Sequence, residues 1–320
     1  MNDRDLLLRL AHGPCSGSEL ARVAGLTRAA VWKRIAALRG KGVDIHAEAG
    51  RGYALAAPLD LLDRAQIVAA LPGDVRADLD ACEVAWEIDS TNAQLLRRPA
   101  GAGVQALFAE AQSAGRGRRG RTWASPLAAQ LCLSVQRRFD GGVAALSGLS
   151  IAVGVAAAEA LRAQGFAQVG LKWPNDLQAH GRKLGGILIE FGGEDGGLVR
   201  AVIGIGINLR MPEVAAAGIE QPWIDLAALG KPIPPRNRLA AELLAAQLRA
   251  LRQFAAEGMP AFVERWQALD VLRGQDIEVI AGDHRDAGVA LGIDARGALR
   301  VRHRDGERVH HSGEISVRAR

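Results

Sequence analysis

The chain has 320 residues, of which 49% are hydrophobic and 23% charged, a balance typical of soluble globular proteins and long enough for two or three domains. Its three cysteines, Cys15, Cys82 and Cys132, lie far apart without metal-ligand spacing, which argues against a disulfide framework and favours a reducing cytoplasm. The net charge is +5, and residues 1–56 alone hold nine basic and five acidic residues. A basic first domain indicates a polyanionic partner.

The N-terminal segment has the pattern of three short helices, over residues 5–11, 19–24 and 28–39. Gly25 provides the turn between the second and third helices, and Thr27 is placed to cap the third. Two short helices joined by a tight turn form a helix-turn-helix, whose second helix can enter the major groove of DNA.

A β-hairpin wing is expected next, from short strands over residues 43–46 and 53–55 around a turn at 48–52. The plain alternative is a small three-helix domain without a DNA role. The order of cap, turn, basic helix and wing favours DNA binding. The residues expected to contact DNA are Thr27, Arg28, Ala29, Trp32, Lys33 and Arg34.

A linker helix over residues 61–71 is expected to lead into a larger domain. There, a strand over residues 84–88 is followed by a turn of sequence Asp-Ser-Thr-Asn at 89–92, which can cap a helix over 93–97. Capping is the plain role of this turn. Its exposed hydroxyls and amides could also bind a small polar ligand.

The densest charge in the chain lies in the loop 115–121, GRGRRGR, where four arginines alternate with three glycines. A basic run is usually only solvated. This one lies mid-chain, between a predicted strand over 104–110, which delivers Gln112, and the stop at 123–126. A flexible backbone with this charge, placed inside a folded domain, predicts a site for a polyanion.

Residues 141–158 contain no charged residue, a length that approaches the roughly 20 residues of a membrane-spanning helix. Because the stretch is rich in Ala, Gly and Ser and poor in Leu and Ile, it predicts a buried helix over about 146–164 instead. A strand over 131–137 is expected before it. No membrane association is predicted.

A strand over residues 169–173 runs into the sequence KWPND at 172–176. Pro174 favours an extended Trp173, so Lys172 and Trp173 are expected to face opposite sides of the sheet, with the following Asn-Asp pair in a turn at its rim. Polar residues directly after a buried strand favour a functional site.

Residues 183–190 and 198–209 are two apolar strands joined by a glycine-rich hairpin at 192–197. The second strand contains Gly204 and Gly206 but lacks the third glycine and the helix start of a dinucleotide-binding fingerprint, which excludes a Rossmann site. Alternating glycines in a strand predict that a flat ligand or another backbone lies against it.

The C-terminal part combines two amphipathic helices with a small β domain. The helices are expected over residues 237–257 and 260–269. The short strands, separated by Gly and Asp turns, are expected over 276–280, 288–293, 298–301 and 315–317.

Five ordered motifs resemble those of biotin protein ligases: GRGRRGR at 115–121, KWPND at 172–176, KLGGILIE at 183–190, GIGIN at 204–208 and GEISVR at 313–318. With the helix-turn-helix in front, the chain is similar to the bifunctional members of this family, which are both biotin ligase and biotin operon repressor. The resemblance covers essentially the whole chain.

The resemblance implies an α+β multidomain fold in three parts. A winged helix-turn-helix DNA-binding domain would occupy residues 1–60. A central mixed-sheet α/β catalytic domain, related to class II aminoacyl-tRNA synthetases, would occupy 61–270, and an SH3-like β-barrel would occupy 271–320.

The resemblance also implies the chemistry: biotin and ATP, with Mg²⁺, form biotinyl-5'-AMP, and biotin is then transferred to a lysine of a biotin carboxyl carrier protein. Lys183 and Arg118 are the implied catalytic residues, and no metal-ligand set of the protein is expected. The implied biotin-binding residues are Ser90, Thr91, Asn92, Gln112, Arg116, Gly117, Arg118 and Lys183. The implied ATP-binding residues are Arg119, Arg121, Lys172, Asn175, Asp176 and Asn208.

By the same resemblance, the adenylate favours a homodimer that binds operator DNA with two winged domains. Two other hypotheses remain: a transcription regulator that senses biotin without ligase activity, and a lipoate-attaching ligase on the same fold. The chain departs from the family pattern at Thr122, where a basic residue is common, and in the proline-rich segment 232–235. Trp223 could cover the adenine, although a packing role is favoured.

Overall fold

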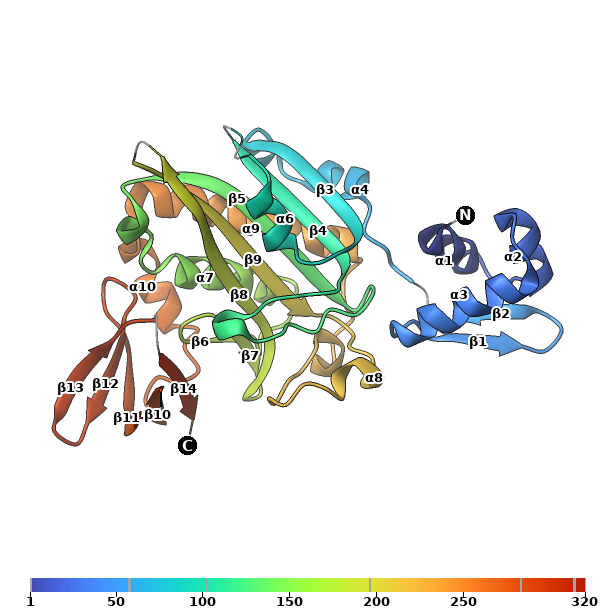
Figure 1. Cartoon of the computed structure of the whole chain (residues 1–320). Helices are drawn as coiled ribbons and strands as arrows, with labels where there is room; N and C mark the ends of the chain where they lie inside the picture. The colour runs from blue at the N-terminus through green and yellow to red at the C-terminus, as the bar shows by residue number, and fades with distance from the viewer. Residues whose placement is uncertain are drawn as a thin grey trace.

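A computed structural model describes residues 2–56, 59–99, 101, 103–195, 197–282, 284–312 and 315–319. Three parts follow one another along the chain: a small helical part with a two-stranded ribbon, a large sheet with helices, and a small β part (Figure 1). Gly196 of the predicted hairpin, and Gly313 and Glu314 of the GEISVR motif, lie outside the described residues.

The N-terminal part is the predicted helix-turn-helix with a wing. It contains α1 (Asp3–Ala11), α2 (Gly17–Ala24), α3 (Arg28–Gly40) and the antiparallel pair β1 (Ile45–Glu48) and β2 (Gly52–Leu55). The Thr27 hydroxyl accepts a hydrogen bond from the Ala30 backbone N–H and caps α3. Gly25 ends α2 with a φ of 64°, in the left-handed region that favours glycine. The predicted cap and turn are confirmed.

The central part is built on a seven-stranded mixed sheet. Its strands are β3 (Leu79–Ile88), β4 (Val104–Gln112), β5 (Gln130–Asp140), β6 (Gly170–Lys172), β7 (Asp176–Ala179), β8 (Arg182–Asp195) and β9 (Leu198–Asn208). In space the order is β3-β4-β5-β9-β8-β7-β6, with β3 and β4 parallel and all other neighbours antiparallel. The long hairpin of β8 and β9 confirms the predicted strand pair.

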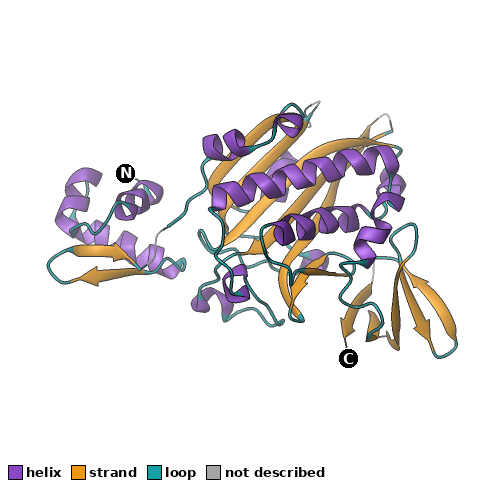
Figure 2. Ribbon diagram, turned by 180° about the vertical axis from the view of Figure 1, so that it is seen from behind, coloured by secondary structure: helices purple, strands orange, loops and turns teal. Residues whose placement is uncertain are grey.

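Helices cover the two faces of this sheet unequally. On one face lie α7 (Leu149–Ala163), α9 (Arg236–Glu257) and α10 (Pro260–Gln267), which pack on one another (Figure 2). In the part of the chain that the structure describes, the other face carries the short α6 (Thr91–Arg97) and the loop after β4 (Figure 1). The polar loops identified in the sequence therefore meet on the more open face.

The uncharged segment of the sequence forms the central helix of the core. The span Val143–Ala163 is long and apolar enough to cross a membrane by length and composition, with a mean hydropathy of 1.7, and 56% of it is buried inside the protein. It starts with a 3₁₀ turn, Val143–Leu146, and continues as α7, whose Ile151, Val153 and Val155 are buried against the sheet and α9. The predicted buried helix is confirmed.

The C-terminal part is a five-stranded antiparallel sheet in the order β13-β12-β11-β10-β14. Its strands are β10 (Asp276–Ala281), β11 (His284–Ile293), β12 (Leu299–His303), β13 (Gly306–His310) and β14 (Ile315–Ala319). The sequence did not predict β13, because this edge strand is polar and exposed and lacks an apolar face.

Two predicted elements need correction. The linker helix is shorter than expected, since α4 (Arg64–Ala70) starts only after its N-cap Asp63. A short α5 (Gly73–Arg76) follows it. Asp176 does not lie in a turn: it is the first residue of β7 and pairs with Lys172 of β6.

Two short elements complete the central part: α8 (Glu213–Ala216) and a 3₁₀ turn, Leu226–Leu229. They precede α9, whose length and position agree with the predicted amphipathic helix.

Candidate functional site

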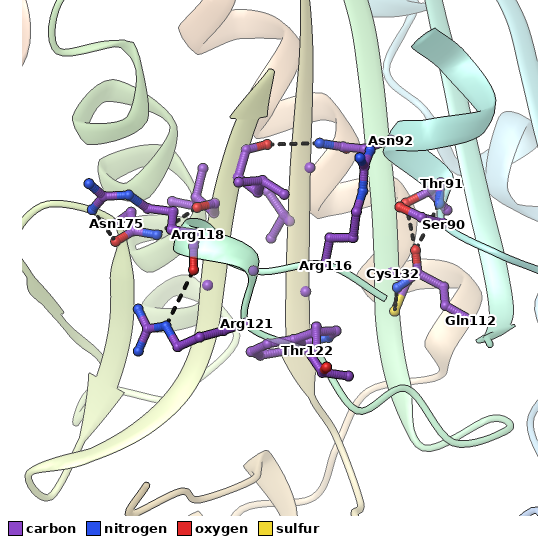
Figure 3. A pocket seen from close by; sticks show the side chains of 18 of the residues that line it. Ser90, Thr91, Asn92, Gln112, Arg116, Arg118, Arg121, Thr122, Cys132 and Asn175 are labelled. Carbon is purple, nitrogen blue, oxygen red and sulfur yellow. Dashed lines mark hydrogen bonds between the residues drawn. The ribbon is translucent and has the colours of Figure 1, made fainter. Parts of the chain in front are cut away.

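An open cavity of about 700 Å³, a volume that includes its mouth, lies on the more open face of the central sheet. It is bounded by β8 and β9 below, by the start of α6, and by the arginine loop, which crosses in front of the sheet (Figure 3). Its lining includes all eight residues that the family resemblance implies for biotin: Ser90, Thr91, Asn92, Gln112, Arg116, Gly117, Arg118 and Lys183.

One end of the cavity is a row of hydrogen-bonding groups from α6 and its neighbours. The backbone N–H and the hydroxyl of Thr91 both lie within hydrogen-bonding distance of Gln112 Oε1, at 2.8 and 3.1 Å. Below them, the hydroxyl of Ser134 lies 2.6 Å from Thr91 Oγ1 and 2.5 Å from Asn92 Oδ1. Ser134 is fully buried, so it fixes these two side chains from beneath.

Glu190 holds two of the cavity's polar side chains together. Its Oε2 accepts hydrogen bonds from Asn92 Nδ2 and from Arg116 Nη2, both at 2.9 Å. The guanidinium of Arg116 thus extends toward Asn92 across the cavity (Figure 3). Neither Ser134 nor Glu190 was predicted as a site residue. Glu190 is the last residue of the KLGGILIE motif, and this motif could have identified it as a site residue.

The arginine loop folds back on itself. Gly117 N–H donates to the Arg121 carbonyl at 2.7 Å, and residues 118–120 form a 3₁₀ turn in which Arg119 is exposed with a φ of 59°. Gly115 allows a close approach, because a Cβ there would lie 2.4 Å from the Trp123 carbonyl oxygen.

Arg118 is the most anchored arginine of this loop. It donates to Asn175 Oδ1 at 3.2 Å and to the Ser312 carbonyl oxygen, which precedes β14 of the C-terminal part. Burial lowers the pKa of Arg118, and the neighbouring Arg119 charge adds to this effect. Arg118 therefore links the loop to both the central sheet and the C-terminal part.

Lys183 occupies the floor of the cavity in an ion pair. Its Nζ lies 2.7 Å from Asp176 Oδ1 and 5.7 Å from the centre of the Trp123 ring, and its side chain is only 12% exposed. Burial lowers the pKa of nearby Lys172; the Asp176 carboxylate opposes this shift, whereas the Lys183 and Arg318 charges add to it. The Asp176 carboxylate thus lies beside both Lys183 and Lys172. The positive charge of this cluster suits an anionic ligand.

The alternating glycines of β9 make room for side chains. A Cβ on Gly204 would lie 2.4 Å from Asn92 Oδ1, and one on Gly206 would lie 2.7 Å from the Trp123 indole ring. The sequence predicted that a flat ligand or another backbone would lie against these glycines, but the side chains of Asn92 and Trp123 lie there. Both glycines also line the cavity.

The residues implied for ATP are only partly gathered at this cavity. Arg121 and Asn175 line it. Lys172 and Asp176 do not, although Asp176 pairs with Lys183, and Arg119 is exposed on the 3₁₀ turn. Asn208 is 3% exposed and does not line the cavity. Trp123 and Cys132, which do line it, were not predicted; burial raises the pKa of the Cys132 thiol to about 11, so this thiol stays neutral.

One departure from the family pattern, Thr122, and the residue considered as an adenine cover, Trp223, both lie near cavity residues. Thr122 is exposed, lines the cavity and pairs with Arg116 in a short bridge. Trp223 pairs with Lys183, whose N–H donates to the Pro222 carbonyl and whose carbonyl accepts from the Ile224 N–H. The segment around Trp223 is therefore packed against Lys183 here.

The third helix of the N-terminal part has a buried and an exposed side. Val31, Ile35 and Leu38 are buried, whereas Arg28, Ala29 and Lys33 are exposed and Trp32 is 59% exposed. Thr27 is exposed at the helix start, and Arg34 is half-buried. The six residues predicted to bind DNA thus lie along the accessible part of α3.

Among the described residues, no group of three or more His, Cys, Asp or Glu side chains is arranged to hold a metal ion. The three cysteines are free and buried. The cavity thus offers cations, amides and hydroxyls as its binding groups.

Three family models match the chain. Residues 88–208 match the biotin/lipoate A/B protein ligase family, residues 4–54 an HTH domain, and residues 274–318 the biotin protein ligase C terminal domain. The first covers the strands and loops that form the cavity, and the other two coincide with the N-terminal and C-terminal parts.

Two related proteins are similar to this chain over two thirds or more of its length. The bifunctional ligase/repressor BirA of Escherichia coli (strain K12) is 41% identical over 316 residues, covering 98% of this chain and 96% of its own. The biotin--[acetyl-CoA-carboxylase] ligase of Mycobacterium tuberculosis is 37% identical over 225 residues, covering 68% of this chain and 81% of its own.

A solved structure shares the fold. The biotin protein ligase from Aquifex aeolicus in complex with biotin and ATP superposes with a TM-score of 0.65 at 25% identity, covering 75% of this chain and all of that one. With identity above 40% along nearly its whole length and an HTH domain in front of the ligase fold, this chain belongs to the family of bifunctional biotin protein ligases and repressors.

Proposed function

We propose that this protein is an ATP-dependent biotin protein ligase, which makes biotinyl-5'-AMP and transfers biotin to a lysine of a biotin carboxyl carrier protein. One observation carries the proposal. Eight residues that the family resemblance implies for biotin, though distant in sequence, line a single cavity with Lys183 at its floor. Family membership and the biotin and ATP in the Aquifex aeolicus complex support the same activity.

In the first step, a biotin carboxylate oxygen attacks the α-phosphorus of ATP and pyrophosphate leaves. Both reactants are anions, so fixed cations must offset their repulsion. Lys183 bridges the carboxylate and the α-phosphate, while Arg118 stabilises the charge that develops during transfer. Asp176, 2.7 Å from Lys183 Nζ, holds this ammonium in place.

The polar end of the cavity holds the ureido group of biotin. Ser90, Thr91, Asn92 and Gln112 offer hydroxyls and amides already fixed by one another and by Ser134 and Glu190. Such preorganised groups lose little freedom when the ligand binds. Arg116 and Gly117 close this end from the loop side.

In the second step, the neutral amine of the carrier lysine attacks the acyl carbon of biotinyl-5'-AMP, loses a proton and expels AMP. The loop 115–121 is placed to cover the reactive anhydride, because it lies across the cavity mouth. Covering the anhydride would slow its hydrolysis.

ATP binds, in this proposal, through Arg119, Arg121, Lys172, Asn175 and Asp176, next to Lys183. Mg²⁺ enters with the ATP phosphates, since this ion is usually held by substrate phosphates and one or two carboxylates. Asp176 and Asn175 are the residues that would hold the ion. When bound, Mg²⁺ would supply positive charge that offsets the charge of the phosphates.

A transfer assay tests the ligase proposal. Purified protein is incubated with ATP, Mg²⁺ and an apo carrier domain, with biotin or with lipoate, and the carrier is weighed by mass spectrometry. We expect a covalent gain with biotin only. Transfer of lipoate alone would overturn the biotin assignment, and no transfer with either would favour a biotin-sensing regulator without ligase activity.

We also propose that the protein represses transcription in response to biotin. The exposed residues of α3, including Arg28, Trp32 and Lys33, support DNA binding. In this scheme biotinyl-5'-AMP favours a homodimer, and the dimer places two winged domains on an operator with two half-sites. The proposed domain boundaries are 1–60, 61–270 and 271–320, and the proposed location is a reducing cytoplasm, where the three free cysteines stay reduced.

Sedimentation and operator binding test this second role. We expect the protein to sediment as a larger species with biotin and ATP than alone, and to bind operator DNA only then. Replacing Lys33 with alanine should weaken DNA binding at least several-fold without changing biotin transfer, because the side chain is exposed on α3. An oligomer that is the same with and without the ligands contradicts this mechanism.

A further inference from the structure

Gln130 is a buried polar residue beside the cavity that the motifs do not include. It is the first residue of β5, is 2% exposed, and does not line the cavity. Directly opposite it in the sheet is Asn208 of β9. We propose that Gln130 is a positioning residue: its side-chain amide holds the Trp123 ring in the cavity wall, and Asn208 orients that amide.

The acceptor end of the Gln130 amide fixes Trp123. Trp123 Nε1 donates a hydrogen bond to Gln130 Oε1 at 3.0 Å. The indole ring then lies against Gly206, and Lys183 Nζ lies 5.7 Å from its centre. Trp123 lines the cavity, so any rotation of this ring changes the wall that faces the ligand.

The donor end of the same amide fixes its orientation. Gln130 Nε2 donates to Asn208 Oδ1 at 2.7 Å, and Asn208 Nδ2 donates in turn to the Ile224 carbonyl at 3.0 Å. Because Asn208 Nδ2 is turned toward the Ile224 carbonyl, Asn208 Oδ1 is the atom that faces Gln130, and Gln130 must supply the donor between the two amides. Its oxygen is thereby left facing Trp123.

This chain of amides ends beside the catalytic lysine. The Ile224 N–H donates to the Lys183 carbonyl at 2.9 Å, so the segment that Asn208 holds also brackets Lys183. The backbone of Gln130 is itself fixed, because Arg236 Nη2 donates to its carbonyl at 2.8 Å. The amide supplies both the donor and the acceptor here, whereas a carboxylate lacks the donor and an apolar side chain lacks both.

A purely structural role for Gln130 makes a different prediction. A satisfied polar residue in the core would affect the stability of the protein but not the binding of one substrate. The inference rests on the proposed biotin ligase function, and it adds that Trp123 must be held by Gln130 for biotin to bind well.

Steady-state pyrophosphate release with varied biotin tests the inference in the full-length protein. The variant is Gln130→Met, and the control is Gln136→Met, on the same strand, equally buried at 2% exposure and away from the cavity. We expect Gln130→Met to raise the KM for biotin roughly tenfold, the cost of one lost hydrogen bond, with kcat changed less than threefold. Gln136→Met should match the wild type.

A third variant, Trp123→Phe, removes the indole N–H that donates to Gln130 and also makes the ring smaller. It should raise the KM for biotin by a similar factor, and the double variant with Gln130→Met should be no worse than either single change. Additive effects, an unchanged biotin KM, or the same KM change in Gln136→Met would each overturn the inference. If Gln130→Met fails to fold, a biotin KM within twofold of wild type in Trp123→Phe would still overturn it. Wild-type activity with biotin tests the proposed function separately.

Discussion

Replacement of Lys183 with methionine is expected to lower the rate of biotinyl-5'-AMP formation by about 10²–10³-fold, the usual cost of losing one donor that stabilises developing charge. Methionine keeps the length of the side chain but removes the ammonium. Lys183 Nζ lies on the cavity floor, 2.7 Å from Asp176, where two anionic reactants would meet. The measurement is pyrophosphate release with saturating biotin and ATP.

The matched control is Lys231→Met, because Lys231 is exposed and does not line the cavity. It should retain wild-type activity, and circular dichroism should show that both variants fold. Supplying synthetic biotinyl-5'-AMP separates the two steps: Lys183→Met should then biotinylate a carrier domain far better than it does from biotin and ATP. If the variant keeps more than a tenth of the wild-type adenylation rate, Lys183 has no part in that step.

The sequence predicted the elements that are stabilised by contacts between residues close together in the chain. The Thr27 cap, the left-handed Gly25 turn and the glycine-rich hairpin between β8 and β9 could be located because their residues satisfy the backbone nearby. The start of α4 could not be located in this way. Residues 60–63 are held in an extended path by side chains of Glu110, Arg236 and Asn237, which are far away in sequence.

The same contrast between local signals and long-range contacts applies to the residues of the cavity. The family resemblance named many residues that line the cavity, although not Trp123 or Cys132, and it named none of those that support them from beneath. Ser134 lies on a strand that reads as an apolar alternation, and Gln130 starts that strand without any motif around it. Their roles depend on contacts with α6, Trp123 and Asn208 that arise only when the sheet is assembled.

A buried ion pair joins the linker to the central sheet. Arg236 Nη1 lies 2.8 Å from Glu110 Oε2, and the two side chains are only 7% and 2% exposed. The guanidinium also donates to the Asp60 and Gln130 carbonyls, and the carboxylate accepts from the Leu62 N–H. This pair therefore fixes the point at which the N-terminal part enters the ligase fold.

Replacing Arg236 with methionine should destabilise the protein by about 3–5 kcal/mol, because the variant leaves the Glu110 carboxylate buried without its partner. The measurement is urea unfolding followed by circular dichroism, with the change taken from the shift of the central-domain transition. Arg249→Met is the control on the same helix: its ion pair with Asp74 is about half exposed, with side chains 50% and 48% accessible, so this variant should lose far less stability than Arg236→Met.

The double variant Arg236→Met with Glu110→Gln separates charge burial from lost packing. A neutral glutamine can still accept the Leu62 N–H, and it removes the uncompensated charge, so at least half of the lost stability should return. If the double variant is as unstable as Arg236→Met alone, the loss comes from the guanidinium's bonds to the Asp60 and Gln130 carbonyls. That result would make Arg236 a clamp on the linker backbone, with the carboxylate as a secondary partner.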